Sequence, residues 1–493
     1  MKRRQSRFLS VLVAFALPVV LVLAAAPAQS QTFSLIYTFG TQSGYPLLPT
    51  GPIAQGSDGA LYATSGFGGT QPSATIDSGT MFKITPAGKL TVLHNFCLQG
   101  APDCADGFTP RGLTLRPDGD FLGVTFGGGQ YSDGVVFNIS AQGVITPLHA
   151  FMGTDGSEPS APPVQGPDGG FYGTTTRGGN SSNCGTIYKI IPGGILVLHR
   201  FDNTDGCNPL MPLVLATDGN LYGTTNAGGK ALAGTIFRIT DCGEFHVLYN
   251  FLGSTDGANP TSPLVQGSDG NLYGSTNLGG DSEFGTIFQI TLSGTLTTVH
   301  QMTETGGTYP SDTLTIASDG NIYGTTNYGG SSSNPNCTTI GPGCGTLFQF
   351  TPGGSFSVLH DFDLSDGWAG AGLLQHTNGL LYGDTAQGGI IDNQCGPNAQ
   401  PLGCGVFYSL ANGLPPFVSL IPYQAKVGKP IRILGQGFTT ATTVSFNGTP
   451  ATILGGGATW LSVVVPAGAT SGPVTISTDT GALTSNPSFV VAP

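Results

Sequence analysis

Residues 218–229 read DGNLYGTTNAGG, and nearly the same words return at residues 269–280 (DGNLYGSTNLGG) and 319–330 (DGNIYGTTNYGG). Alignment on this Asp-Gly step gives seven copies, whose anchor residues are Asp58, Asp118, Asp168, Asp218, Asp269, Asp319 and, as a variant, Asn378. Successive anchors are 60, 50, 50, 51, 50 and 59 residues apart. A period near 50 residues with four short strands is typical of a β-propeller blade, so seven copies predict seven blades.

Each copy contains the same segments in the same order. A strand of the LYGTT type follows the anchor and ends in a Gly-Gly pair that begins ten residues after it. A GTIFQIT-type strand, a Pro/Gly turn, an LTVLHNF-type strand and a loop that often reads TDGxxP complete the copy. Asp-Gly favours a tight hairpin because its glycine tolerates a positive φ, and Gly-Gly favours a bend for the same reason.

The alternation of strand direction assigns these connections to two faces of the ring. We expect the Asp-Gly and Pro/Gly turns on one face, the Asp-Gly face. The Gly-Gly loops and TDGxxP connections then lie on the other, the Gly-Gly face. The loops after Gly-Gly vary from 5 to 16 residues, and the long ones belong to copies one, six and seven. Because variable loops on a rigid scaffold usually carry binding, we expect ligands on the Gly-Gly face.

The first strand of the chain completes the last copy. Residues 33–39 (FSLIYTF) match the closing strand of a copy, yet they precede the first complete one. The seventh copy ends at residues 405–410 (GVFYSL) and lacks its closing strand. We therefore expect residues 33–39 to form the outer strand of blade seven, which leaves no exposed edge there.

The repeated DGNLYGTT…GG…GTIFxIT pattern resembles the bacterial GloVer tandem-repeat family over residues 33–410. The later segments SLIPYQAKVGKPIRILGQGF, TTVSFNGTPAT and SVVVPAGATSGPVTISTDTG resemble an IPT/TIG domain, which is an immunoglobulin-like sandwich. The expected division is a signal peptide (1–28), a seven-bladed propeller (29–411), a linker (412–418) and the IPT/TIG domain (419–493). The resemblance implies an exported all-β protein and no established reaction, cofactor or catalytic residue.

The composition supports an exported, folded chain. Lys2, Arg3, Arg4 and Arg7 precede an apolar run and the small-residue site Ala26-Pro27-Ala28, which is typical of a cleaved secretion signal rather than a membrane anchor. Hydrophobic residues make up 39% of the chain, enough for a large core. Cleavage would leave 12 basic against 28 acidic residues, which disfavours nucleic acid and anionic membranes as partners.

Nine cysteines in an exported chain predict disulfides. Four pairs follow from placement on the Gly-Gly face: Cys97 with Cys104, Cys184 with Cys207, Cys337 with Cys344, and Cys395 with Cys404. Cys242 lies in a Pro/Gly-type turn of the Asp-Gly face, so we expect it to stay a free thiol.

The repeated polar residues favour structural roles. Five histidines fall at one position of the outer strand: His94, His149, His199, His300 and His360. Tyr37 and Tyr249 replace them in the other two copies, which favours packing or a hydrogen bond over metal binding. His376 lies on an inner strand, where we favour packing over a channel role. The TDGxxP aspartates favour Asx-type turns over calcium binding: Asp106, Asp155, Asp205, Asp256 and Asp366.

The inner strands provide no catalytic set. Three residues before the anchors stand Gln55, Leu115, Gln165, Leu215, Gln266, Ile316 and Gln375. Five before stand Ile53, Leu113, Pro163, Leu213, Leu264, Leu314 and Leu373. Neither set contains a carboxylate, lysine or histidine, so we expect core packing with amide hydrogen bonds. The glycine-rich segments lack a following Gly-Lys-Ser/Thr and helix, which argues against a phosphate loop.

Aromatic residues in or beside the loops of the Gly-Gly face are candidate ligand contacts: Tyr45, Phe108, Tyr309, Tyr328 and Trp368. They suit a glycan or a surface protein, and loop packing is the alternative. We expect a monomeric binding or scaffolding protein at the cell surface or in the periplasm. It would need no cofactor or metal and would have no membrane span after signal removal. The alternative is an extracellular carbohydrate-active hydrolase or lyase that uses the same face.

Overall fold

The computed structural model describes residues 31–41, 44–70, 78–98, 104–331, 337, 343–390, 395 and 403–492. The named regular elements in these ranges are all strands, in agreement with the expected all-β class. No helix in these ranges is long and apolar enough to cross a membrane. The expected signal peptide and the long parts of the Gly-Gly loops of copies one, six and seven lie outside the described residues.

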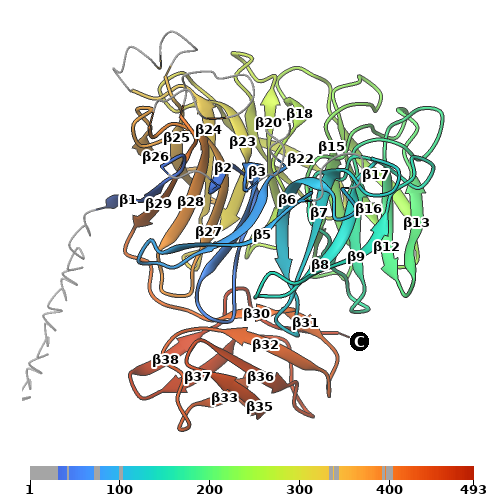
Figure 1. The fold of residues 1–493 in the computed structure, drawn as a ribbon. Coiled ribbons are helices and arrows are strands. Elements are labelled where there is room, and N and C mark those ends of the chain that lie inside the picture. The colour runs from blue at the N-terminus through green and yellow to red at the C-terminus, as the bar shows by residue number, and fades with distance from the viewer. Residues whose placement is uncertain are drawn as a thin grey trace, which may run out of the picture.

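The repeats form seven antiparallel sheets arranged as blades around an axis (Figure 1). From the inner strand outward, the first blade consists of β2 (Pro46–Gln55), β3 (Leu61–Gly68), β4 (Thr80–Ile84) and β5 (Leu90–Asn95), and the second of β6 (Phe108–Leu115), β7 (Phe121–Gly127), β8 (Val135–Ile139) and β9 (Ile145–Ala150). The third consists of β10 (Val164–Gln165), β11 (Phe171–Thr175), β12 (Thr186–Ile191) and β13 (Gly194–Arg200), the fourth of β14 (Val214–Leu215), β15 (Leu221–Thr225), β16 (Thr235–Ile239) and β17 (Phe245–Asn250), and the fifth of β18 (Ala258–Pro260) with β19 (Val265–Gln266), β20 (Leu272–Leu278), β21 (Thr286–Ile290) and β22 (Leu296–Gln301). The sixth consists of β23 (Thr308–Ile316), β24 (Ile322–Tyr328), β25 (Thr346–Phe350) and β26 (Phe356–Asp361), and the seventh of β27 (Trp368–Gln375), β28 (Leu381–Gln387), β29 (Val406–Ala411) and β1 (Thr32–Thr38). We number them blades 1 to 7 in this order.

The N-terminal strand closes the ring as expected. Strand β1 pairs antiparallel with β29, with Phe33 opposite Leu410 and Thr38 opposite Val406. The inner strand of blade 7, β27, also contacts the inner strand of blade 1, β2. Blade 7 is therefore assembled from both ends of the repeat region, and its outer edge is covered by the start of the chain.

The anchor sequence folds as a closed, hydrogen-bonded turn. In blade 4 the Asp218 carboxylate accepts the backbone N–H of Asn220 at 3.0 Å and the Tyr222 hydroxyl at 2.7 Å. Gly219 between them has φ +82°, which only glycine adopts without strain. The tyrosine four residues after the anchor makes the same bond in blades 1, 3, 5 and 6. The repeated DGNLY therefore encodes one hairpin and one buried strand start.

The glycine of LYGTT makes room for the neighbouring strand. A Cβ on Gly223 would lie 2.5 Å from the ring of Phe237, and one on Gly274 would lie 2.4 Å from the ring of Phe288. Both rings are fully buried. The Tyr-Gly step and the Phe of GTIF are thus one packing unit, because the ring fills the space that a side chain would take.

The C-terminal segment forms a two-sheet sandwich. Its strands are β30 (Ser419–Ile421), β31 (Gln424–Ala425), β32 (Pro430–Leu434), β33 (Thr443–Phe446), β34 (Thr449–Pro450), β35 (Thr452–Gly457), β36 (Trp460–Val464), β37 (Val474–Thr478), β38 (Gly481–Thr484) and β39 (Val490–Val491). One sheet runs β30-β32-β36-β35 and the other β34-β33-β37-β38. A buried apolar cluster that includes Ile433, Phe446 and Val463 joins them. The two-sheet form agrees with the immunoglobulin-like class.

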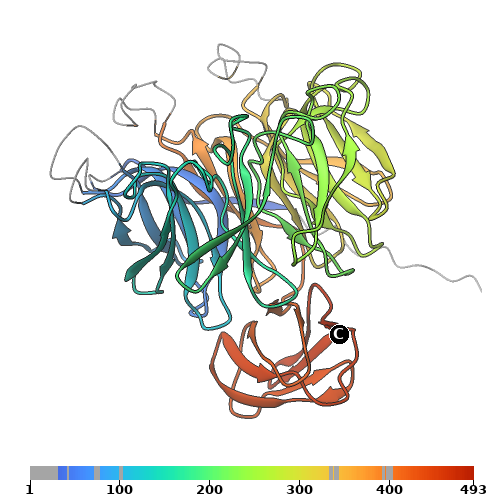
Figure 2. The same cartoon turned by 90° about the vertical axis from the view of Figure 1, so that its right-hand side faces the viewer.

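The C-terminal domain lies against the Asp-Gly face of the propeller (Figures 1 and 2). Arg432 donates to the Pro117 carbonyl at 2.8 Å and to the Ser57 hydroxyl at 2.7 Å. Tyr423 donates to the Leu215 carbonyl. Leu434 belongs to the apolar cluster of blades 1 and 2. The domain therefore covers one end of the propeller and leaves the Gly-Gly face at the other.

Candidate functional site

The mouth of the central channel on the Gly-Gly face is the candidate binding site. It is a hollow of about 280 Å³ at the upper ends of the inner strands. Its lining includes the hydroxyls of Thr50 and Ser160, the Met211 thioether and several prolines. Arg111 is the charged side chain in the lining, and its guanidinium lies 5.1 Å from the centroid of the Phe126 ring. The site can therefore contact a ligand through hydroxyls, backbone groups and one cation.

Arg111 was not among the residues expected from the sequence. It stands seven residues before its anchor, whereas the inner-strand positions considered lie three and five residues before. At the equivalent position five other blades have uncharged residues, and blade 6 has an acid: Gly51, Ala161, Met211, Ser262, Ala371 and, in blade 6, Asp312. A basic residue in an otherwise neutral strand is the signal that identifies it.

Each inner strand has an aliphatic residue at one fixed position of the repeat. These residues stand five before each anchor: Ile53, Leu113, Pro163, Leu213, Leu264, Leu314 and Leu373. All seven are buried. The predicted core packing of this ring is therefore confirmed.

The next ring connects neighbouring blades through glutamine amides. Gln55 of blade 1 donates to the Thr377 hydroxyl of blade 7 at 2.8 Å and accepts its backbone N–H at 3.0 Å. Gln375 makes the same pair of bonds to Ser318 of blade 6. Gln266 does so with Thr217 of blade 4. The expected amide hydrogen bonding is confirmed, and its partners lie one residue before the anchors of the preceding blades.

Three of the five candidate aromatic residues come together above blades 6 and 7. The ring centroids of Tyr309 and Tyr328 are 6.0 Å apart, and those of Tyr328 and Trp368 are 5.6 Å apart, both edge-to-face. Trp368 is only 6% exposed, and its indole N–H donates to the Asn327 carbonyl at 2.7 Å. This array therefore presents edges of Tyr309 and Tyr328 rather than an open indole face.

The other two aromatic candidates lie on blades 1 and 2. Phe108 begins β6, and its ring covers Gly127, where a Cβ would lie 2.3 Å from it. Tyr45 precedes β2, and its carbonyl accepts the Gly69 N–H at 3.3 Å. Both side chains are half-buried. The five candidates thus follow blades 6, 7, 1 and 2 around the rim, and their contact with a ligand stays a prediction.

The outer-strand histidines pair with the TDGxxP aspartates. The Nε2–Oδ2 distances are 2.8–2.9 Å in His94–Asp106, His149–Asp155, His199–Asp205 and His360–Asp366. In blade 4 the Tyr249 hydroxyl donates to Asp256 at 3.0 Å. The other carboxylate oxygen in blade 3 accepts the Asp202 N–H at 3.1 Å. These aspartates therefore hold the turn and the strand together, which confirms the hydrogen bond expected from the His–Tyr exchange.

Two histidines differ from this pattern. His300 is followed by Gly306 where the other blades have the aspartate, and its Nε2 is buried without a hydrogen-bond partner among the described residues. Burial accordingly lowers the pKa of His300. His376 is buried and bonds the Gly59 carbonyl at 3.0 Å and the Asn378 N–H at 3.1 Å. His376 therefore joins blade 7 to blade 1.

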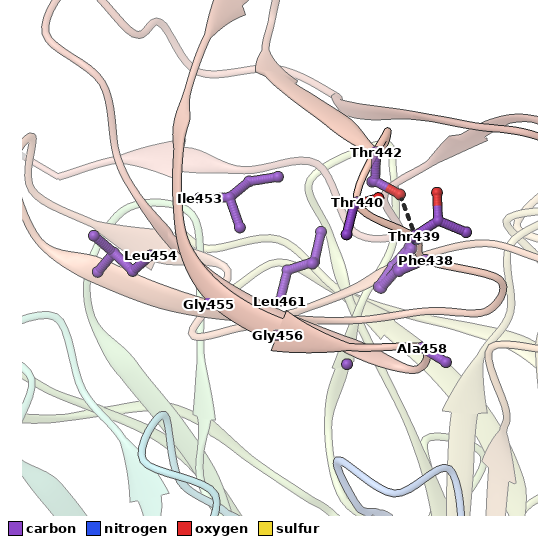
Figure 3. Close-up of a pocket in the computed structure, with 11 residues that line it drawn as sticks. Phe438, Thr439, Thr440, Thr442, Ile453, Leu454, Gly455, Gly456, Ala458 and Leu461 are labelled. Atoms are coloured by element: carbon purple, nitrogen blue, oxygen red, sulfur yellow. Dashed lines mark hydrogen bonds between the residues drawn. The ribbon is translucent and has the colours of Figure 1, made fainter.

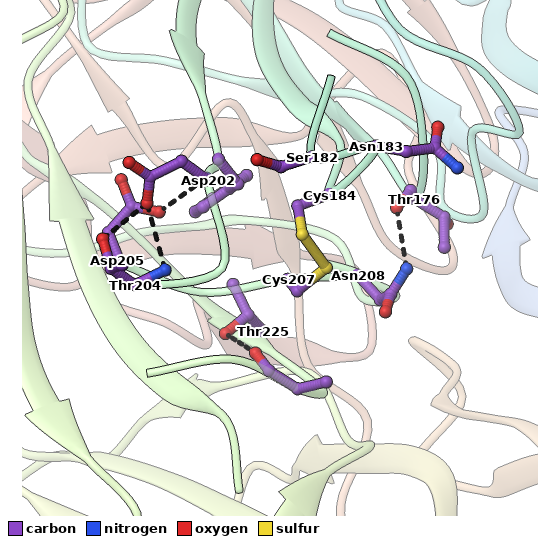
Figure 4. Close-up of a disulfide and its surroundings, with 12 residues drawn as sticks. Thr176, Ser182, Asn183, Cys184, Asp202, Thr204, Asp205, Cys207, Asn208 and Thr225 are labelled. Carbon is purple, nitrogen blue, oxygen red and sulfur yellow. Dashed lines mark hydrogen bonds between the residues drawn. A yellow bond between two sulfur atoms is a disulfide. The ribbon is translucent and has the colours of Figure 1, made fainter. Parts of the chain in front are cut away.

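All four expected disulfides are present and Cys242 is free and exposed. Three of them close short loops, whereas Cys184–Cys207 connects the Gly-Gly loop of blade 3 to the connection that leads into blade 4 (Figure 4). Beside it the Asn208 side chain donates to the Thr176 carbonyl at 3.1 Å. This bridge thus reinforces the junction of two blades.

Asp384 of blade 7 is a buried carboxylate without a hydrogen-bond partner in the described part of the chain. Burial raises its pKa to about 7 from an ordinary 3.8, while the nearby amides of Gly372 and Asp384 itself lower it only in part. Its side chain is fully buried and does not line the mouth. It therefore titrates inside the wall between blades 7 and 1, out of reach of a ligand.

A second hollow, of about 430 Å³, lies within the C-terminal domain (Figure 3). It is bounded by the turn at Phe438–Thr442 and the glycine-rich edge strand β35, with Ile453 and Leu461 at its base. Its lining contains threonines, glycines and aliphatic residues and no ionisable side chain among the described residues. Elsewhere in those residues no three His, Cys, Asp or Glu side chains gather as a metal site.

Two family models match parts of this chain. The model of the Gloeobacter/Verrucomicrobia repeat matches residues 109–340 and, in an overlapping match, residues 213–396. The IPT/TIG domain model matches residues 415–491. The curated proteins gave no match.

Comparison with solved structures gave matches at low sequence identity. Virginiamycin B lyase from Staphylococcus aureus is 16% identical, with 78% of this chain and 99% of that chain covered and a TM-score of 0.50. A fungal alcohol oxidase of the AA5 family, in complex with copper, is 14% identical over 92% and 100% of the two chains, with a TM-score of 0.47. A PQQ-bound aldose sugar dehydrogenase from Streptomyces coelicolor is 15% identical over 78% and 99%, with a TM-score of 0.40.

At these sequence identities the likeness to solved structures concerns the fold alone. The family of the chain is therefore assigned from the matches to the family models. Their two repeat matches together span more than half of the chain. The chain belongs to the Gloeobacter/Verrucomicrobia repeat family and carries a C-terminal IPT/TIG domain.

Proposed function

We propose that this protein is an exported binding module whose Gly-Gly face contacts an extracellular glycan. One observation carries the proposal: the C-terminal domain covers the Asp-Gly face, while the mouth lies at the opposite face, where the Gly-Gly pairs stand. The seven blades provide a rigid support for the loops of this face, and such loops usually carry binding. Export is supported by the four disulfides and by the signal expected at residues 1–28.

The chemistry of the mouth suits a polar ligand. Thr50, Ser160 and backbone groups offer hydrogen bonds, and Arg111 adds a charged donor. Met211 and the surrounding prolines supply apolar contacts that a sugar ring also uses. A surface protein that docks on the same loops is the other kind of partner expected from this face.

Catalysis on the same face is the second candidate, a carbohydrate-active hydrolase or lyase. Glycoside cleavage needs two carboxylates at a defined separation around the bond. None of the described residues that line the mouth is an acid, and Asp384 is fully buried. The mouth therefore favours binding over glycoside hydrolysis.

A glycan array with the mature protein tests the proposal, with reducing-sugar release measured in parallel. We expect array signals and no sugar release. Arg111→Gln should weaken the signal about tenfold if the guanidinium makes one charged hydrogen bond to the ligand. Lys89→Gln, which removes one exposed charge from the Asp-Gly side, is the matched control and should change nothing. Sugar release would favour the enzyme. Equal array signals from Arg111→Gln and Lys89→Gln would exclude the mouth as the binding site.

A further inference from the structure

One position of the repeat stands at the rim of the mouth. It lies eight residues after each anchor, at the end of the second strand of its blade. Asn327 of blade 6 and Ala386 of blade 7 occupy this position, and both line the mouth. Around the ring, from blade 1 to blade 7, the residues are Gly66, Phe126, Thr176, Asn226, Asn277, Asn327 and Ala386. Blades 4, 5 and 6 therefore place three asparagines in succession along one side of the rim, which we call the asparagine arc.

The fold does not use the side chains of the asparagine arc. Asn226, Asn277 and Asn327 are half-buried, and none of their carboxamide groups has a hydrogen-bond partner among the described residues. The unpaired side-chain atoms that the described part of the fold buries belong to other residues. The oxygen and nitrogen atoms of the arc are therefore accessible to a ligand at the rim.

The main chain of the arc is held in place although its side chains are free. The Asn226 carbonyl accepts the Asn259 side-chain N–H at 2.8 Å, and the Asn327 carbonyl accepts the Trp368 indole N–H at 2.7 Å. Both donors come from the next blade. Asn277 lies within β20, which pairs with β18 at the residues before and after it. Because the backbone is already ordered, binding through these side chains loses less conformational freedom.

The chemistry of a carboxamide indicates what the arc contacts. Its oxygen accepts hydrogen bonds and its nitrogen, beside it, donates them. Two hydroxyl groups on adjacent carbons of a sugar ring match this pair, because one hydroxyl donates to the oxygen while the other accepts from the nitrogen. Three such groups in succession suit a chain of sugar units, each of which repeats the same pair of hydroxyls.

We infer that the mouth selects glycans whose sugar units carry free hydroxyls on adjacent carbons, and that the asparagine arc determines this specificity. The inference rests on the function proposed above and adds to it the class of glycan and the side of the rim that recognises it. Hydroxyl pairs of the bound chain meet Asn327 in the lining of the mouth and then Asn277 and Asn226 along the rim.

The choice of glycans on the array tests the class of ligand. Inner units of malto-, cello- and manno-oligosaccharides have free hydroxyls on two adjacent carbons. Inner units of laminari-oligosaccharides do not, because the carbon between their two free ring hydroxyls carries the linkage. We expect the full mature chain to bind one or more of the first three and to bind laminari-oligosaccharides at least tenfold more weakly.

Alanine variants of the full mature chain test the arc itself. Asn226→Ala/Asn277→Ala removes two carboxamides and should weaken binding to the malto-, cello- or manno-oligosaccharide that the wild type binds at least tenfold. Alanine fits this position, since blade 7 already has it there. Asn220→Ala/Asn271→Ala is the matched control, because it changes the same blades two residues after their anchors, on the Asp-Gly face. The control should leave the affinity unchanged.

The outcomes separate this inference from the proposed function. Thermal unfolding and near-ultraviolet circular dichroism establish that each variant is folded. Array signals from laminari-oligosaccharides alone would overturn the inference and leave glycan binding in place. Wild-type affinity in a folded Asn226→Ala/Asn277→Ala variant would do the same. The absence of any array signal would contradict the proposed function, and the inference with it.

Discussion

At the scale of single residues, Asp384 stands at the position where blade 1 has a threonine hydroxyl that bonds the neighbouring blade. In blade 1 the equivalent Thr64 accepts the Gly112 N–H of blade 2 at 2.8 Å and donates to the Thr50 carbonyl at 2.8 Å. Around the ring, the residue that corresponds to Gly112 and faces blade 7 is Pro52, which has no N–H. Asp384 is thus an acid at a position where the expected donor is missing, and it is buried with a raised pKa.

The stability of the protein should accordingly fall as Asp384 ionises. Its folded pKa of about 7 lies above the ordinary 3.8, so the folded state binds the proton more tightly than the unfolded state. The resulting destabilisation is absent below pH 4, grows between pH 4 and 7 and is complete above pH 7, where it reaches roughly 4 kcal/mol. Asp384→Asn should therefore stabilise the fold at pH 8 and change little at pH 4.

Denaturant unfolding at both pH values measures this difference. Asp281→Asn, at an exposed position, is the control and should not alter the pH dependence. A variant Asp384→Asn with the same pH profile as the wild type would show that the carboxylate has a partner or that its pKa is not raised.

His300 offers the reverse experiment, in which a missing partner is supplied. His199 in blade 3 stacks on Phe245 with centroids 3.8 Å apart and bonds Asp205, whereas His300 stacks on Phe356 at 4.1 Å and has Gly306 at the aspartate position. Gly306→Asp should raise the pKa of His300 and stabilise the fold by about 1 kcal/mol relative to Gly306→Ala.

An NMR titration of the His300 ring and thermal unfolding of the three proteins provide the measurements. The alanine variant controls for the Cβ, which would lie 3.0 Å from the Thr303 hydroxyl and 3.2 Å from the Phe356 ring. A His300 pKa that does not move in Gly306→Asp would refute the pairing.

At the scale of strands and loops, the Cys184–Cys207 bridge connects blades 3 and 4, which also share a buried apolar cluster. It spans 23 residues, against 7 or 9 for the other three. The double variant Cys184→Ser/Cys207→Ser should lose about 3 kcal/mol in the free energy of unfolding. Cys97→Ser/Cys104→Ser is the comparison, and it should lose less because its closed loop is shorter. The opposite order would contradict the role given to the bridge.

The strand order, the ring closure, the disulfide pairs and the free thiol were predictable because each follows from the repeat or from the face on which a residue lies. The His–Asp partners were not, because the aspartate belongs to a loop whose path depends on the backbone. Asn208 and Tyr309, which precede prolines in those loops, have φ +57° and +54°, a conformation that non-glycine residues rarely adopt. Residue patterns alone do not give such a turn.

The mouth and the unsatisfied side chains of Asp384 and Gln165 could not be predicted from the sequence either. Arg111, Met211 and Ser160 come from three blades and share a lining only because the ring closes. Asp384 and Gln165 are unsatisfied because a proline, Pro52 or Pro117, replaces a donor on the neighbouring blade. Each of these features depends on contacts between copies, whereas the pattern within one copy predicts only the blade.

At the scale of the whole molecule, the two ends of the propeller have different surroundings. The Asp-Gly face carries the contacts of Arg432, Thr459 and Gln436 with the turns of blades 1, 2 and 7. The Gly-Gly face carries the mouth and the candidate aromatic residues of blades 6, 7, 1 and 2. The central claim is that ligand binding uses the Gly-Gly face.

Blocking one face at a time tests this claim most directly. Cys242 is an exposed thiol on the Asp-Gly side, so it can be coupled to a large polyethylene glycol maleimide in the natural chain. In Cys242→Ser/Lys230→Cys the thiol moves to an exposed position just after the Gly-Gly pair of blade 4. Binding to glycan-array hits should survive coupling at Cys242 and be lost on coupling at residue 230. Loss of binding only in the protein coupled at Cys242 would contradict the account.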